Sequence, residues 1–192
     1  VPAMPLPENA VDKAVAKLDG IAEELMRKSG IPGMAVAVVH QGKTVYSKGF
    51  GVRDVKTGDR IDADTVFQLA SLSKPLTSTA IMMLYEEGRF QLDDPISKFI
   101  PAFANPRVMT GGSRGKIETM PAEREINFRD LLTHTSGLTY GFMESNPVDA
   151  AYRAKEGGVD FQTADTSLKQ LVERLAQLPL IAQPGKAWNY SV

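Results

Sequence analysis

The sequence predicts an α+β fold whose strands gather near the N-terminus and are followed by helices. Two observations carry this prediction. Apolar residues recur at spacings of three and four over residues 11–29, 71–87 and 168–178, which indicates three amphipathic helices. Between the first two of these, two β-rich runs at residues 34–40 and 43–50 flank a short glycine-containing link, which predicts an antiparallel hairpin.

Turn residues set the expected bounds of the other elements. A short strand is expected at residues 65–67, and Gly88 ends the second helix. Asp94 as the N-cap and Pro95 as the first helical residue predict a short helix, and Asn127 can cap another helix. A glycine-rich stretch at 111–115 predicts a flexible loop, so the second half of the chain is expected to be mostly helical.

Composition and charge limit the class of protein. Apolar residues make up 43% and charged residues 23% of the 192 residues, as in globular proteins. The net charge of −1 argues against nucleic acid or an anionic membrane as the main partner, and no apolar run approaches the roughly 20 residues of a transmembrane helix. Cysteine is absent and only two histidines occur, so we expect no metal site. The composition leaves the compartment open between cytoplasm and periplasm.

Ser71 and Lys74 form an S-x-x-K pattern at the start of the predicted helix 71–87. Side chains three residues apart share a helix face, and a serine at the helix start lies at the positive end of the macrodipole. Lysine can take the serine proton if burial lowers its pKa from about 10.4 toward about 7–8. The pattern therefore indicates a lysine-activated nucleophile, with a capping serine and a solvated lysine as the alternative.

The same pattern occurs again at Ser113 and Lys116, inside the glycine-rich stretch. No predicted strand precedes it and no apolar helix follows it. We interpret this second copy as exposed loop, and it shows how weakly the bare pattern discriminates.

Longer stretches of the chain resemble the serine β-lactamase superfamily. They lie in family order and read FQLASLSKPLT (67–77), LDDPI (92–96) followed by FIP (99–101), LLTHTSGL (131–138) and PGKAWNYS (184–191). The nearest branch comprises the class C-like β-lactamases and the family VIII carboxylesterases. This resemblance implies a β-lactamase/transpeptidase-like fold, in which helices and a helical region flank an antiparallel sheet.

The resemblance also implies roles for individual residues. Ser71 becomes the acyl-accepting nucleophile, and Lys74 and Tyr190 become its proton-handling partners. Tyrosine, with an ordinary pKa near 10, acts as a base only where a cation such as Lys74 stabilises the phenolate. Which of the two takes the serine proton stays open. The Ser71 backbone N–H would be one oxyanion-hole donor, and Tyr140 and Phe142 are candidate residues of the acyl pocket.

A single histidine beside the serine invites a Ser-His-Asp interpretation, which the family resemblance disfavours. In the family this histidine is no triad base. We expect His134 to satisfy backbone groups around the turn at residues 135–137 and interpret His40, at a strand end, as structural or exposed.

The sequence departs from the family pattern in two ways. Class C β-lactamases usually show Tyr-x-Asn, whereas this chain reads Tyr190-Ser191-Val192, which favours ester hydrolysis or acyl transfer. The strand motif that normally supplies the second oxyanion-hole donor does not follow the tyrosine, so that donor is absent from the chain. We therefore expect residues 1–70 to be the N-terminal part of the α/β domain and residues 71–192 to be the nucleophile helix and a mostly helical region. The missing C-terminal strands would come from a C-terminal segment of the same protein.

The leading hypothesis is a serine hydrolase that forms an acyl-enzyme, above all a carboxylesterase acting on small acyl esters. A β-lactamase or D,D-peptidase-like hydrolase, or an acyltransferase, is the alternative within the same chemistry. The alternative of another class is a non-catalytic fragment or subunit that needs a second polypeptide to complete the site. The expected partner is a small-molecule ester or lactam, with no nucleic acid and no membrane, and the chemistry requires no cofactor.

Overall fold

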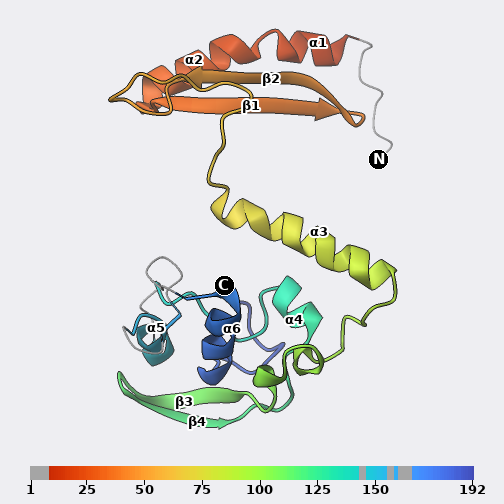
Figure 1. The fold of residues 1–192 in the computed structure, drawn as a ribbon, viewed down its shortest axis with the longest axis vertical. Coiled ribbons are helices and arrows are strands. Elements are labelled where there is room, and N and C mark those ends of the chain that lie inside the picture. The colour runs from red at the N-terminus through yellow and green to blue at the C-terminus, as the bar shows by residue number, and fades with distance from the viewer. Residues whose placement is uncertain (1–8, 143–145, 155–157, 160–165) are drawn as a thin grey trace. The chain divides into compact units, whose positions relative to one another are not determined.

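The computed structural model describes residues 9–142, 146–154, 158–159 and 166–192. The chain divides into two compact units, residues 1–70 and residues 71–192 (Figure 1). Each unit is described by itself.

The first unit contains two helices and one hairpin. The helices are α1 (Ala10–Val15) and α2 (Leu18–Ser29), and the strands are β1 (Gly33–His40) and β2 (Lys43–Gly51). The strands pair antiparallel from Gly33↔Gly51 to His40↔Lys43, as the sequence predicts, and the helices run along the hairpin (Figure 1). The single helix expected over residues 11–29 is two helices.

The short strand expected at residues 65–67 does not form. The Thr65 hydroxyl donates to the Asp62 carboxylate at 2.8 Å and accepts from the Asp62 amide at 3.0 Å. These local bonds close a turn, which competes with strand pairing for the same backbone. Val66 is 94% exposed, so no apolar face supports a strand here.

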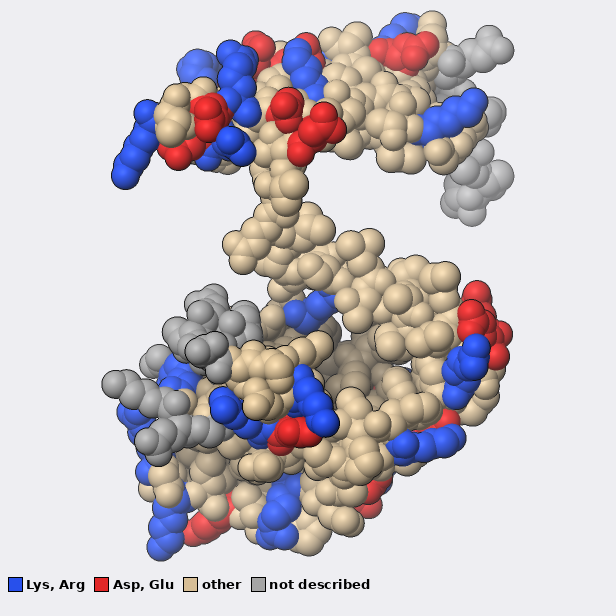
Figure 2. Space-filling model, viewed as in Figure 1, with Lys and Arg blue, Asp and Glu red and all other residues tan. Residues whose placement is uncertain are grey.

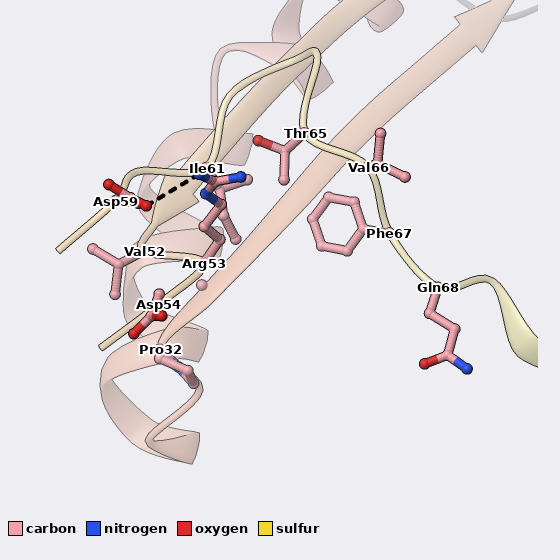
Figure 3. Close-up of a pocket in the computed structure, with 11 residues that line it drawn as sticks. Pro32, Val52, Arg53, Asp54, Asp59, Ile61, Thr65, Val66, Phe67 and Gln68 are labelled. Carbon is pink, nitrogen blue, oxygen red and sulfur yellow. Dashed lines mark hydrogen bonds and ion pairs between the residues drawn. The ribbon is translucent and has the colours of Figure 1, made fainter. Parts of the chain in front are cut away.

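A cavity of about 540 Å³ lies in the first unit, beside the start of β1 (Figure 3). Arg53 and Asp59 form an ion pair of 3.0 Å on its wall, and Phe67 lies nearby. Its lining contains none of the predicted site residues, all of which belong to the second unit.

A 3-10 turn, Ala70–Leu72, begins at the last residue of the first unit and leads into α3 (Ser73–Glu86) of the second. Among the described residues of this unit, two more 3-10 turns, a hairpin and three helices follow. They are Ile96–Lys98, Pro101–Phe103, β3 (Arg107–Ser113), β4 (Lys116–Pro121), α4 (Phe128–Leu132), α5 (Pro147–Tyr152) and α6 (Leu168–Gln177).

The glycine-rich stretch expected to be a flexible loop belongs to the hairpin of β3 and β4, so that expectation is wrong. A bulge between Met109 and Gly111 accommodates the glycines, and Gly112 adopts a φ of +107°. Ser113 and Lys116 are cross-strand partners at the hairpin end. The second S-x-x-K copy therefore has no helical geometry.

A hydrophobic cluster in the second unit holds later segments of the chain together. Its buried members are Ile96, Phe103, Val108, Ile126, Leu138 and Leu180. The Leu180 amide donates to the Arg107 carbonyl, and the Leu180 carbonyl accepts from the Met109 amide, both at 2.8 Å. The Ile181 amide donates to the Gly137 carbonyl at 2.8 Å. These contacts place residues 134–142 beside the C-terminal segment.

Gly137 is required where these segments meet. Its φ is +83°, and an added Cβ would lie 2.3 Å from the Ala182 carbonyl oxygen. Only glycine fits both constraints.

Charged side chains of both signs are interspersed over the visible face of each unit, in keeping with the net charge of −1 (Figure 2). Within the described ranges, no helix is both long enough and apolar enough to cross a membrane. The same residues contain no cluster of three or more histidine, aspartate or glutamate side chains suited to a metal ion.

Candidate active site

Ser71 lies in the 3-10 turn that precedes α3, and Lys74 lies in the first turn of that helix. Ala70, directly before the serine, has a φ of +47°, which a residue with a Cβ rarely adopts. Such strain is typical of functional sites. The serine is exposed at the helix start, where the helix dipole favours negative charge on its oxygen.

The Lys74 ammonium lies between two tyrosine rings. Its Nζ donates to the Tyr140 hydroxyl at 2.9 Å and is 5.0 Å from the ring centroids of both Tyr140 and Tyr190. The two rings stack with centroids 5.6 Å apart and planes 13° from parallel. The structure therefore brings together three predicted residues, Lys74, Tyr140 and Tyr190.

Tyr190 is also linked to the serine. A hydrogen bond from Ser71 lowers the pKa of Tyr190 below its ordinary value, and the hydrogen bond and charge of Lys74 add to this effect against the opposing effect of burial. A phenol with a lowered pKa is a better base near neutral pH than an ordinary tyrosine.

The pKa of Lys74 moves away from the range that a lysine base near neutral pH would require. Burial lowers it, but hydrogen bonds and charge from Tyr140 and Tyr190 outweigh burial and raise the pKa above its ordinary value of 10.5. The condition under which Lys74 could act as a near-neutral base, a pKa lowered by burial, is therefore not met. Two phenol oxygens stabilise the ammonium, which suits Lys74 to be the cation that supports a Tyr190 phenolate.

Backbone contacts between residues 134–139 and 189–192 hold Tyr190 in place. The Asn189 amide donates to the His134 carbonyl at 2.8 Å, and Asn189 Nδ2 donates to the Leu138 carbonyl at 3.0 Å. The Ser191 amide donates to Nδ1 of His134 at 3.3 Å. Tyr190 is thus flanked on both sides by residues bonded to this turn.

His134 contacts the tyrosine segment through its ring. The imidazole centroid lies 4.7 Å from that of Tyr190, and the rings are tilted by 44°. Sequence reasoning expected His134 to satisfy backbone groups of its own turn. Its ring nitrogen instead accepts from the Ser191 amide, 57 residues further along the chain.

Tyr140 is positioned by α5, a helix that sequence reasoning missed. The Thr139 hydroxyl donates to the buried carboxylate of Asp149 at 2.7 Å, and the Thr139 amide donates to the Tyr152 hydroxyl at 3.4 Å. Arg153 donates to the Gly141 carbonyl on the other side of Tyr140. Asn146 caps this helix by accepting from two backbone amides, which is the local signal that could have revealed it.

Phe142 lies at the edge of the group formed by Lys74, Tyr140 and Tyr190. Its ring centroid is 4.8 Å from that of Tyr140, and the side chain is 58% exposed. Trp188, 68% exposed, lies at another edge, with its ring 6.3 Å from His134.

The base of the turn is fixed by a buried carboxylate. Asp130 accepts from both terminal nitrogens of Arg124, at 2.6 and 2.9 Å, and from the Asn127 amide at 3.0 Å. Asn127 in return accepts from the Asp130 amide, which completes the capping box at the predicted start of α4.

Fold and side chains together define an α+β protein with a serine before a helix, a lysine one turn later and a tyrosine from a distant segment. A family model described as "Beta-lactamase" matches residues 18–192, so the chain belongs to the Beta-lactamase family. Its fold is the β-lactamase/transpeptidase-like one that the sequence predicts.

Three similar proteins illustrate the range of the family. "Protein Rv1367c" of Mycobacterium tuberculosis is 39% identical over 85% of this chain and 39% of its own length. "Esterase EstB" of Burkholderia gladioli is 31% identical over 92% of this chain and 42% of its own length. The solved structure of "EstCE1, a hydrolase with promiscuous acyltransferase activity" is similar with a TM-score of 0.74 and 28% identity, over 94% of this chain and 44% of that one. The chain thus spans less than half the length of these relatives.

Proposed function

We propose that the protein is a serine hydrolase that acts through an acyl-enzyme on Ser71, and that its substrates are small carboxylic esters. The observation that carries this proposal is the position of Lys74, whose ammonium donates to Tyr140 and lies over the ring of Tyr190, the phenol whose pKa is lowered by Ser71 and Lys74. The arrangement links a nucleophile, a base and a cation that stabilises the base.

Acylation begins with the Tyr190 phenolate. It takes the proton from the Ser71 hydroxyl as the serine oxygen attacks the ester carbonyl carbon, and the carbonyl electron pair moves onto oxygen. The resulting oxyanion accepts a hydrogen bond from the Ser71 amide at the start of α3. The intermediate collapses, the C–O bond to the alcohol breaks, and the protonated Tyr190 returns its proton to the departing alcohol oxygen.

Deacylation repeats these steps with water. The Tyr190 phenolate takes a proton from water as the water oxygen attacks the acyl carbon. The bond to the Ser71 oxygen then breaks, and Tyr190 protonates that oxygen to regenerate the free enzyme. Lys74 remains an ammonium throughout, which agrees with its raised pKa.

One oxyanion donor is assigned to Ser71, and the proposal needs a second. Loss of one such donor costs about 10²- to 10³-fold in rate. We propose that a C-terminal segment of the same protein supplies it, because the relatives named above are longer than this chain.

Ester hydrolysis is favoured over lactam hydrolysis because Val192 stands where class C enzymes carry an asparagine. Acyl transfer to an alcohol is the second candidate. It needs only that an alcohol replace water in the second half-reaction, and EstCE1 is a hydrolase with promiscuous acyltransferase activity.

Intact mass after incubation with p-nitrophenyl butyrate tests the proposal. We expect a mass increase of one butyryl group in the wild-type protein and none in Ser71→Ala. Ser113→Ala, which changes the serine of the second S-x-x-K copy, is the matched control and should keep the adduct. Absence of an adduct on folded wild-type protein would contradict the proposal. Parallel turnover of nitrocefin separates an esterase from a β-lactamase.

A further inference from the structure

We propose that His134 is a positioning residue for Tyr190, which rests on the proposed role of Tyr190 as the base. The unprotonated Nδ1 of His134 holds the Ser191 amide and thereby fixes the backbone that carries the tyrosine. Geometry supplies three independent contacts. Nδ1 accepts from the Ser191 amide at 3.3 Å, the His134 carbonyl accepts from the Asn189 amide at 2.8 Å, and the two aromatic rings lie 4.7 Å apart. His134 thus binds the residues before and after Tyr190.

The contact with Ser191 assigns the protonation state. A backbone N–H can only donate, so Nδ1 must carry no proton, and the neutral imidazole has its hydrogen on Nε2. The Ser191 hydroxyl lies 3.5 Å from the same nitrogen, and Ser191 is 97% buried, so water cannot readily replace the lost acceptor. Protonation of Nδ1 would place its N–H opposite the N–H of the Ser191 amide, so the hydrogen bond between them would be lost.

The charges around His134 reinforce this requirement. Lys74 of α3 faces it, and Tyr190 lies against its ring, while on α4 the Asp130 carboxylate is bonded to Arg124. Burial, together with the Lys74 charge, lowers the pKa of His134 below its ordinary value of 6.5. The imidazole is therefore neutral at neutral pH and gains its proton only in acid.

The backbone of His134 adds a constraint that guides the test. Its φ is +57°, in the left-handed region that asparagine tolerates better than most residues. His134→Asn keeps a side-chain acceptor near the position of Nδ1 and cannot titrate. His134→Leu keeps the bulk but offers no acceptor.

The inference predicts a distinct pH dependence. As the pH falls, kcat/KM first decreases with slope one as Tyr190 gains a proton, and it steepens toward slope two below pH 6.5 as His134 gains one. His134→Asn should keep kcat within about threefold of wild type at pH 8 and lose the steepening. His134→Leu should lower kcat about 10- to 100-fold at every pH, because small displacements of a catalytic group are costly.

Trp188 offers a readout that does not depend on activity. It is the only tryptophan, and its ring lies 6.3 Å from that of His134, so protonation of the imidazole should quench its fluorescence. The wild-type titration should show an inflection below pH 6.5 that His134→Asn lacks. His40→Asn, which changes the only other histidine, is the matched control and should keep both the inflection and the steepening.

The outcomes separate this inference from the proposed function. If wild type forms no adduct on Ser71, the proposed function fails and this inference fails with it. If the adduct forms but folded His134→Asn is inactive at all pH values, or retains the acidic steepening, the inference alone is overturned. A merely structural histidine would lower the melting temperature and leave the shape of the pH profile unchanged.

Discussion

Tyr140 accepts a hydrogen bond of 2.9 Å from Lys74, a residue 66 positions earlier in the chain. The contact gives the lysine a second phenol partner besides Tyr190. The ammonium therefore lies against both phenol rings, and its charge remains available to Tyr190.

Removal of the Tyr140 hydroxyl should weaken catalysis without disturbing the fold. Tyr140→Phe keeps the ring stack on Tyr190 but leaves Lys74 without one acceptor, and we expect kcat for p-nitrophenyl butyrate to fall about tenfold, as for a lost hydrogen bond to a charged group. Tyr85→Phe makes the same chemical change on α3 and should leave kcat unchanged. Equal rates for both variants would contradict this role of Tyr140.

The opposite pKa shifts of the two central groups set the pH profile. In the proposed mechanism Tyr190 acts as a phenolate, so we expect kcat/KM to increase as it loses its proton, at a pH below its ordinary pKa of 10.0. Lys74 acts there as a cation, so we expect activity to decrease only as it loses its proton above its ordinary pKa of 10.5. Initial rates on a short-chain ester, corrected for spontaneous hydrolysis, measure both limbs. A decrease that begins near pH 7–8 would instead indicate a lysine with a lowered pKa.

The bond between Thr139 and Asp149 should matter for both stability and rate. Thr139→Val has nearly the same shape but leaves the buried carboxylate without this donor, and we expect a loss of about 1–3 kcal/mol in the free energy of unfolding. Thr139→Ser restores the hydroxyl. Urea unfolding measures stability and steady-state kinetics measure rate. Thr139→Ser should have a higher free energy of unfolding and a higher kcat than Thr139→Val. Equal values for the two variants would contradict the role of this bond in supporting Tyr140.

Two arginine–aspartate pairs allow a comparison of buried and exposed ion pairs. Arg124→Ala leaves the nearly buried Asp130 without its bidentate partner and should destabilise the protein by about 3–5 kcal/mol. Arg129→Ala breaks a pair with Asp93 in which both side chains are exposed, so it should change stability little. Chemical denaturation of both variants measures the loss in the free energy of unfolding. Similar losses in the two variants would contradict the idea that burial of Asp130 makes its ion pair the more stabilising one.

The sequence predicted what depends on local pattern. The hairpin of β1 and β2, the caps at Asn127 and the bounds of α6 follow from periodicity and capping residues that lie close together in the chain. The second hairpin was missed because its glycines were interpreted as a loop. In the structure a β-bulge accommodates them, and a bulge can be recognised only from the pairing of the two strands.

In the candidate site, too, the sequence predicts local relationships but not contacts between distant segments. The S-x-x-K pattern of Ser71 and Lys74 is local and visible in the sequence, whereas the contact of Lys74 with Tyr140 and that of His134 with Ser191 join residues far apart in sequence. The direction of the Lys74 pKa also depends on distant contacts. Burial is foreseeable from a helix position, but the two phenol oxygens that outweigh it come from distant segments.

Covalent labelling with a fluorophosphonate probe, followed by peptide mapping, shows whether Ser71 is the nucleophile. The serine oxygen attacks phosphorus and fluoride leaves, so the label marks the activated serine. We expect one label per chain, on the peptide that contains Ser71, and slower labelling in Tyr190→Phe. A label on Ser113, or none on folded protein, would contradict this role of Ser71.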